Sequence, residues 1–423
     1  MKKILLKSAQ VIDESSPHHN KTVNVLIDKG NIAKIGKETP DADKVIDAKG
    51  MILSPGWFDM RASFGDPGYE HKEDITSGLE TATAGGFTGV ALLPNNKPVT
   101  QTKNEVSYLK SRNAGSITEI FPIGAVSIDA KGEELTEMID LHHAGAVAFS
   151  DGIHPIWHTD ILLKSLQYLQ KFDGLLINLP EDTRLNLFGT MNEGVNSTML
   201  GMKGMPKLSE ELIVQRDLEL LQYAGGRLHF TNISSERSVA MIKAAKKRGL
   251  EVSCDIAAFQ TAFDDSTLSG FDTNFKVNPP FREKKDNKAM IKGLQEGTIE
   301  VIVSSHIPQD EESKKLEFDL ADFGIISLQT VAHNLSVLSD SVDMELLIKA
   351  VSHNPRKLLR LPVPTVKEGE PANLTLFDPA REWVLNSKSN KSRSKNSPFW
   401  GKAIKGKAVA VFNQGKQYID DTI

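Results

Sequence analysis

Three polar side chains alternate along one short segment of the stretch GWFDMRASFGDPG, residues 56–68. The run FDMRASF predicts a buried strand, and the Asp-Pro-Gly triplet after it predicts a turn. Because alternate side chains share one face of a strand, Asp59, Arg61 and Ser63 would point together into a pocket at its end. Loops at strand ends often carry catalytic groups. A carboxylate, a guanidinium and a hydroxyl are nevertheless an unusual set for any chemistry.

Further candidates for chemistry follow later apolar runs. Asp151 and Asp255 lie at the ends of such runs, and three carboxylates on different strands could face one another or pair with a base such as Arg61. His158 and His306 follow predicted strands, so each could serve a site or simply hydrogen-bond to loop backbone. H-E-x-x-H, G-x-S-x-G and a cysteine cluster are all absent from the sequence.

Eight apolar runs, most of them separated by helical patterns, must position these groups. Their alternation predicts a (β/α)8 barrel over residues 56–366, with the site at the carboxyl ends of the strands. An open doubly wound sheet is the competing architecture, but no G-x-G-x-x-G or phosphate-binding loop opens a helix. Residues 1–55 and 367–423 instead show period-two patterns, which predict a small β-sandwich built from both chain ends.

Composition restricts the classes of partner. The 423 residues carry a net charge of -5, with a pI near 6.2, which favours neither nucleic acid nor a membrane surface. The basic stretch LNSKSNKSRSKNSPF reads as a solvated loop, since it lacks aromatic interleaving. Cys254 is the only cysteine and is expected to pack in a core, as suits a cytoplasmic protein. No run is long enough to predict a membrane helix, and the amino terminus does not read as a targeting signal.

Several longer stretches together resemble the dihydroorotase family of the amidohydrolase superfamily. They are SPGWFDMRASFGDPGYEHKEDITSGLETATAGGFTGVALLPNNKP, GAVAFSDG, KVNPPFREKKDN, LEFDLADFGIISLQT, NPRKLL, GEPANLTLFDP and SKNSPFWGKAIKGK. The resemblance covers essentially the whole chain, whereas allantoinases and hydantoinases fit less well. It implies a (β/α)8 barrel with a β-sandwich, and reversible cyclisation of N-carbamoyl-aspartate to dihydroorotate with one or two zinc ions.

The resemblance also implies that the residues expected of an active family member are replaced. The metal-ligand positions hold Arg61, Ser63, Leu179 and Asn232, and only the carboxylate of Asp151 remains. The catalytic acid-base position holds Ser305, and the positions of a substrate-binding arginine and histidine hold Gly65 and Gln309. Substrate-contacting positions that match are Asn95, Asn278, Phe323 and Gly324.

These replacements predict that the chain binds no zinc and is catalytically inactive. Zinc needs three or four N, S or O donors, and Arg61 would place a positive charge beside the cation. We therefore expect a structural or regulatory homologue that forms a homodimer and associates with aspartate transcarbamoylase, as degenerate family members do. Two alternatives remain. One is an active hydrolase that uses Asp151, Asp255, His158 or His306; the other is a non-catalytic binder of a pyrimidine-like carboxylate through Arg61, Asn95 and Asn278.

Overall fold

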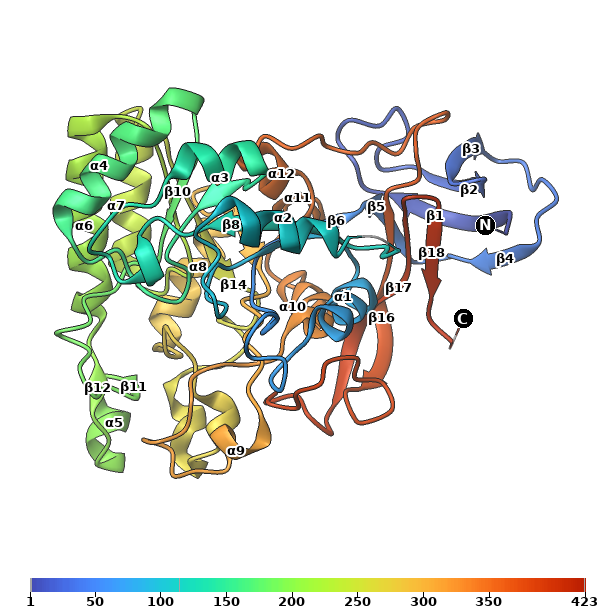
Figure 1. Ribbon diagram of the computed structural model, residues 1–423. Helices are drawn as coiled ribbons and strands as arrows, with labels where there is room; N and C mark the ends of the chain where they lie inside the picture. Colours follow the sequence, from blue (N-terminus) through green and yellow to red (C-terminus); the bar gives the residue numbers. More distant parts are fainter. Residues whose placement is uncertain (1, 114, 422) are drawn as a thin grey trace.

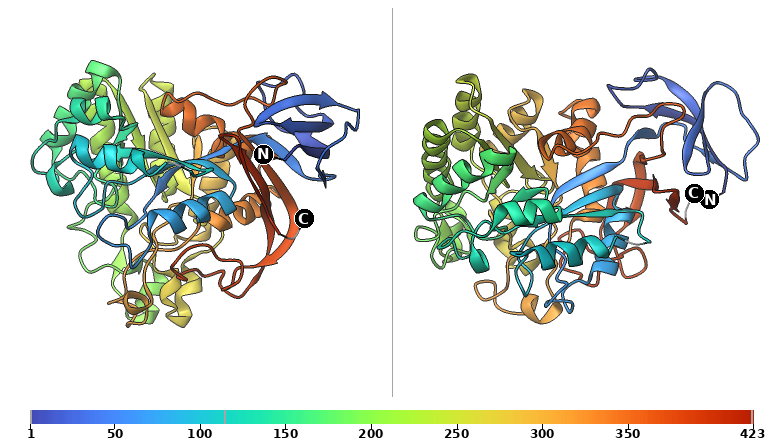
Figure 2. Two further views of the ribbon diagram at one scale, coloured as in Figure 1. Left: turned by 45° about the vertical axis from the view of Figure 1, so that its right-hand side comes forward. Right: turned by 45° about the horizontal axis from the view of Figure 1, so that its top comes forward.

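The computed structural model describes residues 2–113, 115–421 and 423. Its two sheets have different origins. One is a parallel barrel from the middle of the chain, and the other is a sheet from both chain ends that lies to one side of the barrel (Figures 1 and 2). The expected fold class is confirmed.

Every apolar run that predicts a barrel strand forms one. The strands are β6 (Trp57–Ala62), β7 (Phe87–Leu92), β8 (Glu119–Gly124), β9 (Ala148–Phe149), β10 (Leu175–Asn178), β13 (Arg227–Phe230), β14 (Val252–Ala257) and β15 (Val301–Val303). They pair in parallel in the order β15-β14-β13-β10-β9-β8-β7-β6. A bridge between Ala62 and His306, with the Ser63 amide donating to the His306 carbonyl at 2.9 Å, joins the two outer strands. The carboxyl ends of all eight strands therefore surround one mouth.

The chain ends form an eight-stranded sheet. Its strands are β1 (Ile4–Val11), β2 (Thr22–Asp28), β3 (Asn31–Gly36), β4 (Lys44–Asp47), β5 (Ile52–Pro55), β16 (Leu374–Val384), β17 (Ala403–Asn413) and β18 (Lys416–Ile419). Antiparallel pairing of β5 with β16, including Ser54 opposite Thr375, brings the two ends together. A separate apolar cluster, which contains Ile4, Val25 and Leu374, packs this sheet. Because neither end could bury that surface alone, the pairing is what makes the sheet stable.

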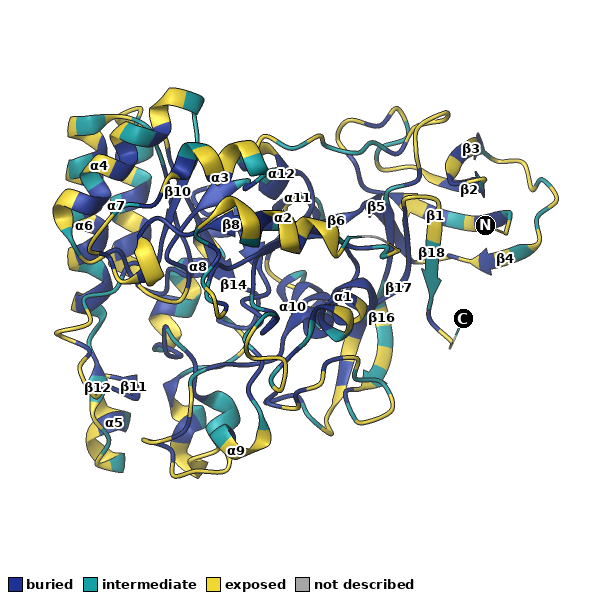
Figure 3. Ribbon diagram, in the orientation of Figure 1, coloured by how far each residue is buried: buried dark blue, intermediate teal, exposed yellow. Residues whose placement is uncertain are grey.

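Helices cover the outside of the barrel. They are α1 (Ile75–Ala84), α2 (Lys103–Ser111), α3 (Met138–Ala144), α4 (Thr159–Leu169), α6 (Lys207–Ala224), α7 (Glu236–Lys247), α8 (Lys284–Gln295), α10 (Val331–Leu338), α11 (Met344–Val351) and α12 (His353–Leu358). Their inward faces are buried while many outward residues are exposed (Figure 3). Smaller elements project from the mouth: β11 (Met191–Asn192), α5 (Val195–Leu200), β12 (Gly204–Met205) and α9 (Glu311–Lys314).

The helix α7 shows why the local sequence folds as it does. The Ser235 hydroxyl accepts hydrogen bonds from the amides of Arg237 and Ser238 at its start, and Lys246 and Lys247 occupy its last turn. Gly249 has a φ of 84°, a conformation that favours glycine, just after the helix ends. The capping, the charge placement and the glycine all agree with the pattern in the sequence.

Two further observations bear on the sequence predictions. No helix within the described residues is both long and apolar enough to cross a bilayer. Cys254 is buried, and burial raises the pKa of its thiol well above the ordinary value. A packing role for this cysteine is therefore confirmed.

Candidate functional site

The mouth of the barrel holds a buried network of polar side chains. Asp59 lies on β6, opposite Ser304, which follows β15. The two carboxylate oxygens of Asp59 accept hydrogen bonds from the Ser304 backbone N–H, at 2.8 Å, and from the Ser304 hydroxyl. Asp59 is fully buried, and this burial raises the pKa of its carboxyl to about 7. The side chain therefore joins the first and last strands of the barrel.

Arg61, on the same strand β6, has a side chain that is only 1% exposed. Its Nη1 donates to the Gly152 carbonyl at 3.3 Å, and its Nε has no hydrogen-bond partner within the described residues. Burial lowers the pKa of Arg61 to about 10, while the charges of Asp255 and then Asp59 oppose that shift. Arg61 thus remains positively charged at neutral pH and forms the cationic centre of the network.

Asp255, on β14, connects two neighbouring strands. Its carboxylate forms a hydrogen bond with His229 Nε2 at 2.9 Å and accepts another from the backbone N–H of Asn232 at 2.6 Å. The other ring nitrogen of His229 lies 2.7 Å from the Ser253 hydroxyl. Asn232 Nδ2 donates to the Ser305 hydroxyl at 2.8 Å, and both residues have a φ near 50°. Such left-handed conformations at two strand ends are held by the surrounding bonds.

Within the described residues, no hydrogen bond joins any two of the four groups that an active hydrolase would use. Asp151 accepts the amides of Val126 and Ser127 and the Ser127 hydroxyl. His158 accepts the Asp160 amide at the start of α4, and His306 Nδ1 accepts the Ser327 amide at 3.0 Å. With Asp255 bound to His229, each group is engaged by a different part of the structure. An active hydrolase would need these side chains within hydrogen-bond reach of one another, so their separate engagement does not support that alternative.

A segment from the chain-end sheet packs against the loops that follow β6 and β15 at this mouth. Residues 386–400, between β16 and β17, form what we call the strap. The buried carboxylate of Glu73 accepts the Ser392 hydroxyl and the Arg393 amide, and it also accepts the Ser77 hydroxyl from α1. Its Oε2 lies 3.5 Å from His306 Nε2. Glu73 is thus the point at which the strap, α1 and the end of β15 meet.

The interpretation of the strap as a solvated loop is wrong. Ser392, Ser394 and Asn396 are buried, whereas Lys391, Arg393 and Lys395 between them are exposed. Asn396 Oδ1 accepts a hydrogen bond from the backbone N–H of Gln309 at 3.1 Å. The inward side chains of the strap therefore bond to loops of the mouth. Short polar side chains can satisfy backbone groups in this way, which composition alone does not reveal.

Replacing Glu73 by glutamine is expected to loosen the strap. Glutamine keeps one acceptor oxygen, and its amide group would face donors such as the Arg393 amide. The loss should be about 1–3 kcal/mol of unfolding free energy in urea titration, since it leaves a buried donor unsatisfied. Trypsin should also cleave faster after Lys391, Arg393 and Lys395. Glu80→Gln, at an exposed position of the following helix α1, is the matched control, and equal behaviour of the two variants would contradict the role of Glu73.

Comparison with known proteins decides the family. A family model described as dihydro-orotase-like matches residues 50–238. A protein from Syntrophus aciditrophicus named dihydroorotase is 38% identical over 420 residues, which covers 98% of both chains. The chain belongs to the dihydroorotase family. The dihydroorotase of Geotalea daltonii is also 38% identical, over 418 residues and 98% of each chain.

Solved structures of related enzymes share the fold of this dihydroorotase-family chain. An L-hydantoinase from Arthrobacter aurescens superposes with a TM-score of 0.85, covering 99% of this chain and 96% of that one, at 21% identity. A dihydropyrimidinase from Brevibacillus agri gives a TM-score of 0.81, covering 100% and 95%, at 20% identity. At these identities the likeness concerns the fold alone.

The positions that match substrate contacts of the dihydroorotase family are engaged within the protein. Asn95 Nδ2 donates to the Asp151 carbonyl at 3.0 Å and its Oδ1 accepts the Ile153 amide at 2.9 Å. Asn278 Nδ2 donates to Glu181 Oε2 at 2.8 Å. Both asparagines therefore hold loops of the mouth in place.

A second group of these positions lies on either side of α9, with Gln309 before the helix and Phe323 and Gly324 after it. Gln309 Nε2 donates to the Phe323 carbonyl at 2.7 Å, and its Oε1 accepts Lys72 Nζ at 2.6 Å. The Lys276 ammonium lies 4.7 Å from the centre of the Phe323 ring. Gly324 has a φ of 145°, and a Cβ there would lie 2.6 Å from the Ile307 carbonyl oxygen.

The positions that match metal ligands offer few donors. Leu179 is apolar and buried, Ser63 is half-buried, and the side chains of Asn232 and Ser305 bond to each other. Over the described ranges, no three or more His, Cys, Asp or Glu side chains form a group that could hold a metal ion.

Sequence reasoning missed two residues of the mouth, His229 and Glu73. The only signal for His229 is a polar residue inside the apolar run LHFTNIS, which by itself more often marks a packed histidine. Glu73 precedes Asp74, which caps α1 through the Ser77 amide. The sequence predicts the cap but not the burial of its neighbour, because that burial depends on a strap more than 300 residues away.

Proposed function

We propose that this dihydroorotase-family protein is catalytically inactive and acts as a structural or regulatory partner in pyrimidine biosynthesis. The family reaction is the reversible hydrolysis of dihydroorotate to N-carbamoyl-aspartate. The observation that carries the proposal is the buried guanidinium of Arg61 at a position that matches a zinc ligand of the family. A fixed positive charge there repels a divalent cation at short range, where little water screens it.

The residues around Arg61 do not fit zinc. The nearby carboxylates of Asp59 and Asp255 already accept hydrogen bonds from Ser304, His229 and Asn232. A zinc site needs three or four donors at about 2.0–2.3 Å, in a tetrahedral arrangement. Without such a site water keeps a pKa far above neutral, and Ser305 cannot exchange protons as a carboxylate does.

Loss of the substrate carboxylate clamp supports the same proposal. Gly65 matches the substrate-binding arginine, and a Cβ built on Gly65 would lie 2.2 Å from the Tyr69 carbonyl oxygen. The Tyr69 carbonyl therefore occupies space that a side chain at residue 65 would need. Regaining the arginine would require a different backbone path from residue 65 to residue 69.

An active cyclic-amide hydrolase with an atypical site is the second candidate. Its support is the 38% identity, over nearly the full length, to proteins named dihydroorotase. Against it stands the separate engagement of Asp151, His158 and His306. A non-catalytic binder of a pyrimidine-like carboxylate is less favoured, since the amides of Asn95 and Asn278 are already bonded within the chain.

The deciding experiment measures zinc and turnover together. We expect the purified protein to hold far less than one equivalent of zinc and to hydrolyse no dihydroorotate above the blank. The Syntrophus aciditrophicus relative, purified in the same way, is the control for the assay. Stoichiometric zinc with turnover that persists after removal of contaminating enzyme would establish the second candidate instead.

The partner is tested separately. We propose that the chain, as a cytoplasmic homodimer, associates with the aspartate transcarbamoylase of the same cell. Size-exclusion chromatography with light scattering should show a dimer alone and a larger complex after mixing. Separate elution of the two proteins at micromolar concentration would remove the partner claim and leave the question of catalysis untouched.

A further inference from the structure

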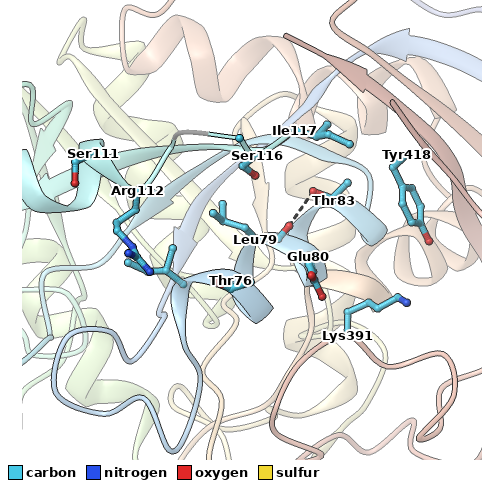
Figure 4. A pocket seen from close by; sticks show the side chains of 12 residues that line it. Thr76, Leu79, Glu80, Thr83, Ser111, Arg112, Ser116, Ile117, Lys391 and Tyr418 are labelled. Carbon is cyan, nitrogen blue, oxygen red and sulfur yellow. Dashed lines mark hydrogen bonds between the residues drawn. The ribbon is translucent and has the colours of Figure 1, made fainter. Parts of the chain in front are cut away.

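A cavity lies over α1, one of the helices that cover the outside of the barrel. Its volume is about 710 Å³, and segments distant in sequence build it: α1, the loop after α2, the strap and β18. Figure 4 shows α1 as its floor, with Arg112 on one side and Lys391 and Tyr418 on the other. The size suits a small organic molecule, since such pockets span roughly 300–1,000 Å³.

The floor of this outer cavity is apolar. Ile75 and Leu79 from α1 and Ile117 from the loop line it. Tyr418 contributes an aromatic ring, whose hydroxyl donates to Asp420 at 3.4 Å. Burial raises the pKa of the Tyr418 hydroxyl, so this side chain remains a neutral phenol. A flat or apolar body would gain contact with these surfaces by displacing water from them.

Charged groups on its rim have no ionic partner within the described residues. The Arg112 guanidinium lies 6.0 Å from the centre of the Tyr108 ring, and neither a hydrogen bond nor an ion pair holds it. The Lys391 amide donates to Gln329 Oε1 at 2.8 Å, which fixes the backbone and leaves the ammonium available. Glu80 on α1 is likewise unpaired. By contrast, the Thr83 hydroxyl is already bonded to the Leu79 carbonyl and to Thr118.

This combination defines the chemistry of a ligand. Two cations face one carboxylate, so the rim favours an anion, and a guanidinium binds phosphate or carboxylate through two parallel hydrogen bonds. The carboxylate of Glu80 can accept an N–H group from the same molecule. We propose that this outer cavity binds a small organic anion with a flat, N–H-bearing body, its acidic group on Arg112 and its body between Leu79 and Tyr418.

The position of the outer cavity gives such binding a structural consequence. Lys391 belongs to the strap, and Tyr418 belongs to the sheet of the chain ends. A ligand that contacts both of them and α1 would hold the strap and the chain-end sheet against the barrel. Binding should therefore slow tryptic cleavage of the strap.

Calorimetric titration with two probes tests the proposal and separates two sources of the anion. Uridine 5′-monophosphate carries a phosphate and orotate a carboxylate, and both have a flat ring with an N–H group. At least one should bind, and uridine, which has no anionic group, should bind at least tenfold more weakly than the phosphate probe. Arg112→Ala should weaken binding of the better probe roughly 10- to 100-fold, as expected for loss of a charge-assisted pair.

Two further variants locate the binding. Leu79→Trp should abolish it by filling the cavity, while Lys388→Ala, on the strap outside the cavity, should leave it unchanged. Failure of both probes to bind at millimolar concentration, or equal affinity of Arg112→Ala and the unaltered protein, would overturn the proposal. Because the readout is binding heat, its outcome is independent of whether the barrel mouth is catalytically active.

Discussion

Replacing Arg61 by methionine is expected to lower the free energy of unfolding by about 3–5 kcal/mol at pH 8. Methionine fills a similar volume but removes a buried positive charge that interacts with the buried carboxylates of Asp255 and Asp59. Removing one partner of a buried charged group costs about this much, because the other partner stays buried and unpaired. Urea titration followed by circular dichroism measures the loss.

A double variant separates charge from packing. Arg61→Met with Asp59→Asn removes a positive and a negative group together, so it should regain part of the stability lost in Arg61→Met. Arg184→Met, at an exposed arginine, is the control and should change stability by less than about 0.5 kcal/mol. If the losses of the two single variants simply add in the double variant, Arg61 does not act as the counter-charge of Asp59.

The pH dependence of stability is expected to carry the signature of Asp59. Its carboxyl has a pKa of about 7 in the folded protein because of burial, against an ordinary value of 3.8. Between about pH 4 and pH 7 the folded state therefore binds a proton that the unfolded state has released. The free energy of unfolding should fall as pH rises through this window, by about 1.4 kcal/mol per pH unit for a full proton, and then level off.

Asp59→Asn tests that assignment. Asparagine preserves the shape and can still accept the Ser304 amide, but it does not titrate. The variant should show a flatter profile between pH 5 and pH 7 than the unaltered protein. Asp41→Asn, at an exposed aspartate, should reproduce the original profile. Identical slopes for Asp59→Asn and the unaltered protein would assign the proton to another group. Asp151, whose pKa burial raises to about 6, is the next candidate.

The fold follows closely from local patterns. Apolar runs such as GVALLP and EVSCDIA become barrel strands because a parallel sheet buries both faces of each strand. The alternating segments of the chain ends become one sheet because neither end can cover its own apolar face. These patterns involve residues that are close together in the chain, so a single sequence is enough to predict the elements.

Only part of the site can be predicted from the sequence. The residue types at Arg61, Ser63, Gly65 and Ser305 depart from the pattern that the family resemblance implies, and this departure can be recognised in the sequence. Their partners do not appear in the pattern. Asn95, which matches a substrate contact, holds the loop after β9, and Asp151, which matches a metal ligand, binds the loop after β8.

The stretch GWFDMRASFGDPG shows which features the sequence determines and which depend on the tertiary structure. Its residues alone determine a buried strand followed by a turn, and a strand face that presents Asp59 and Arg61 together. Only the tertiary structure decides that Asp59 bonds to Ser304, 245 positions later, and that a strap from the far end of the chain bonds to Glu73 beside the same mouth. Strand propensity and alternation depend on neighbours in the chain, whereas the burial of a charge and the identity of its partner depend on closure of the barrel.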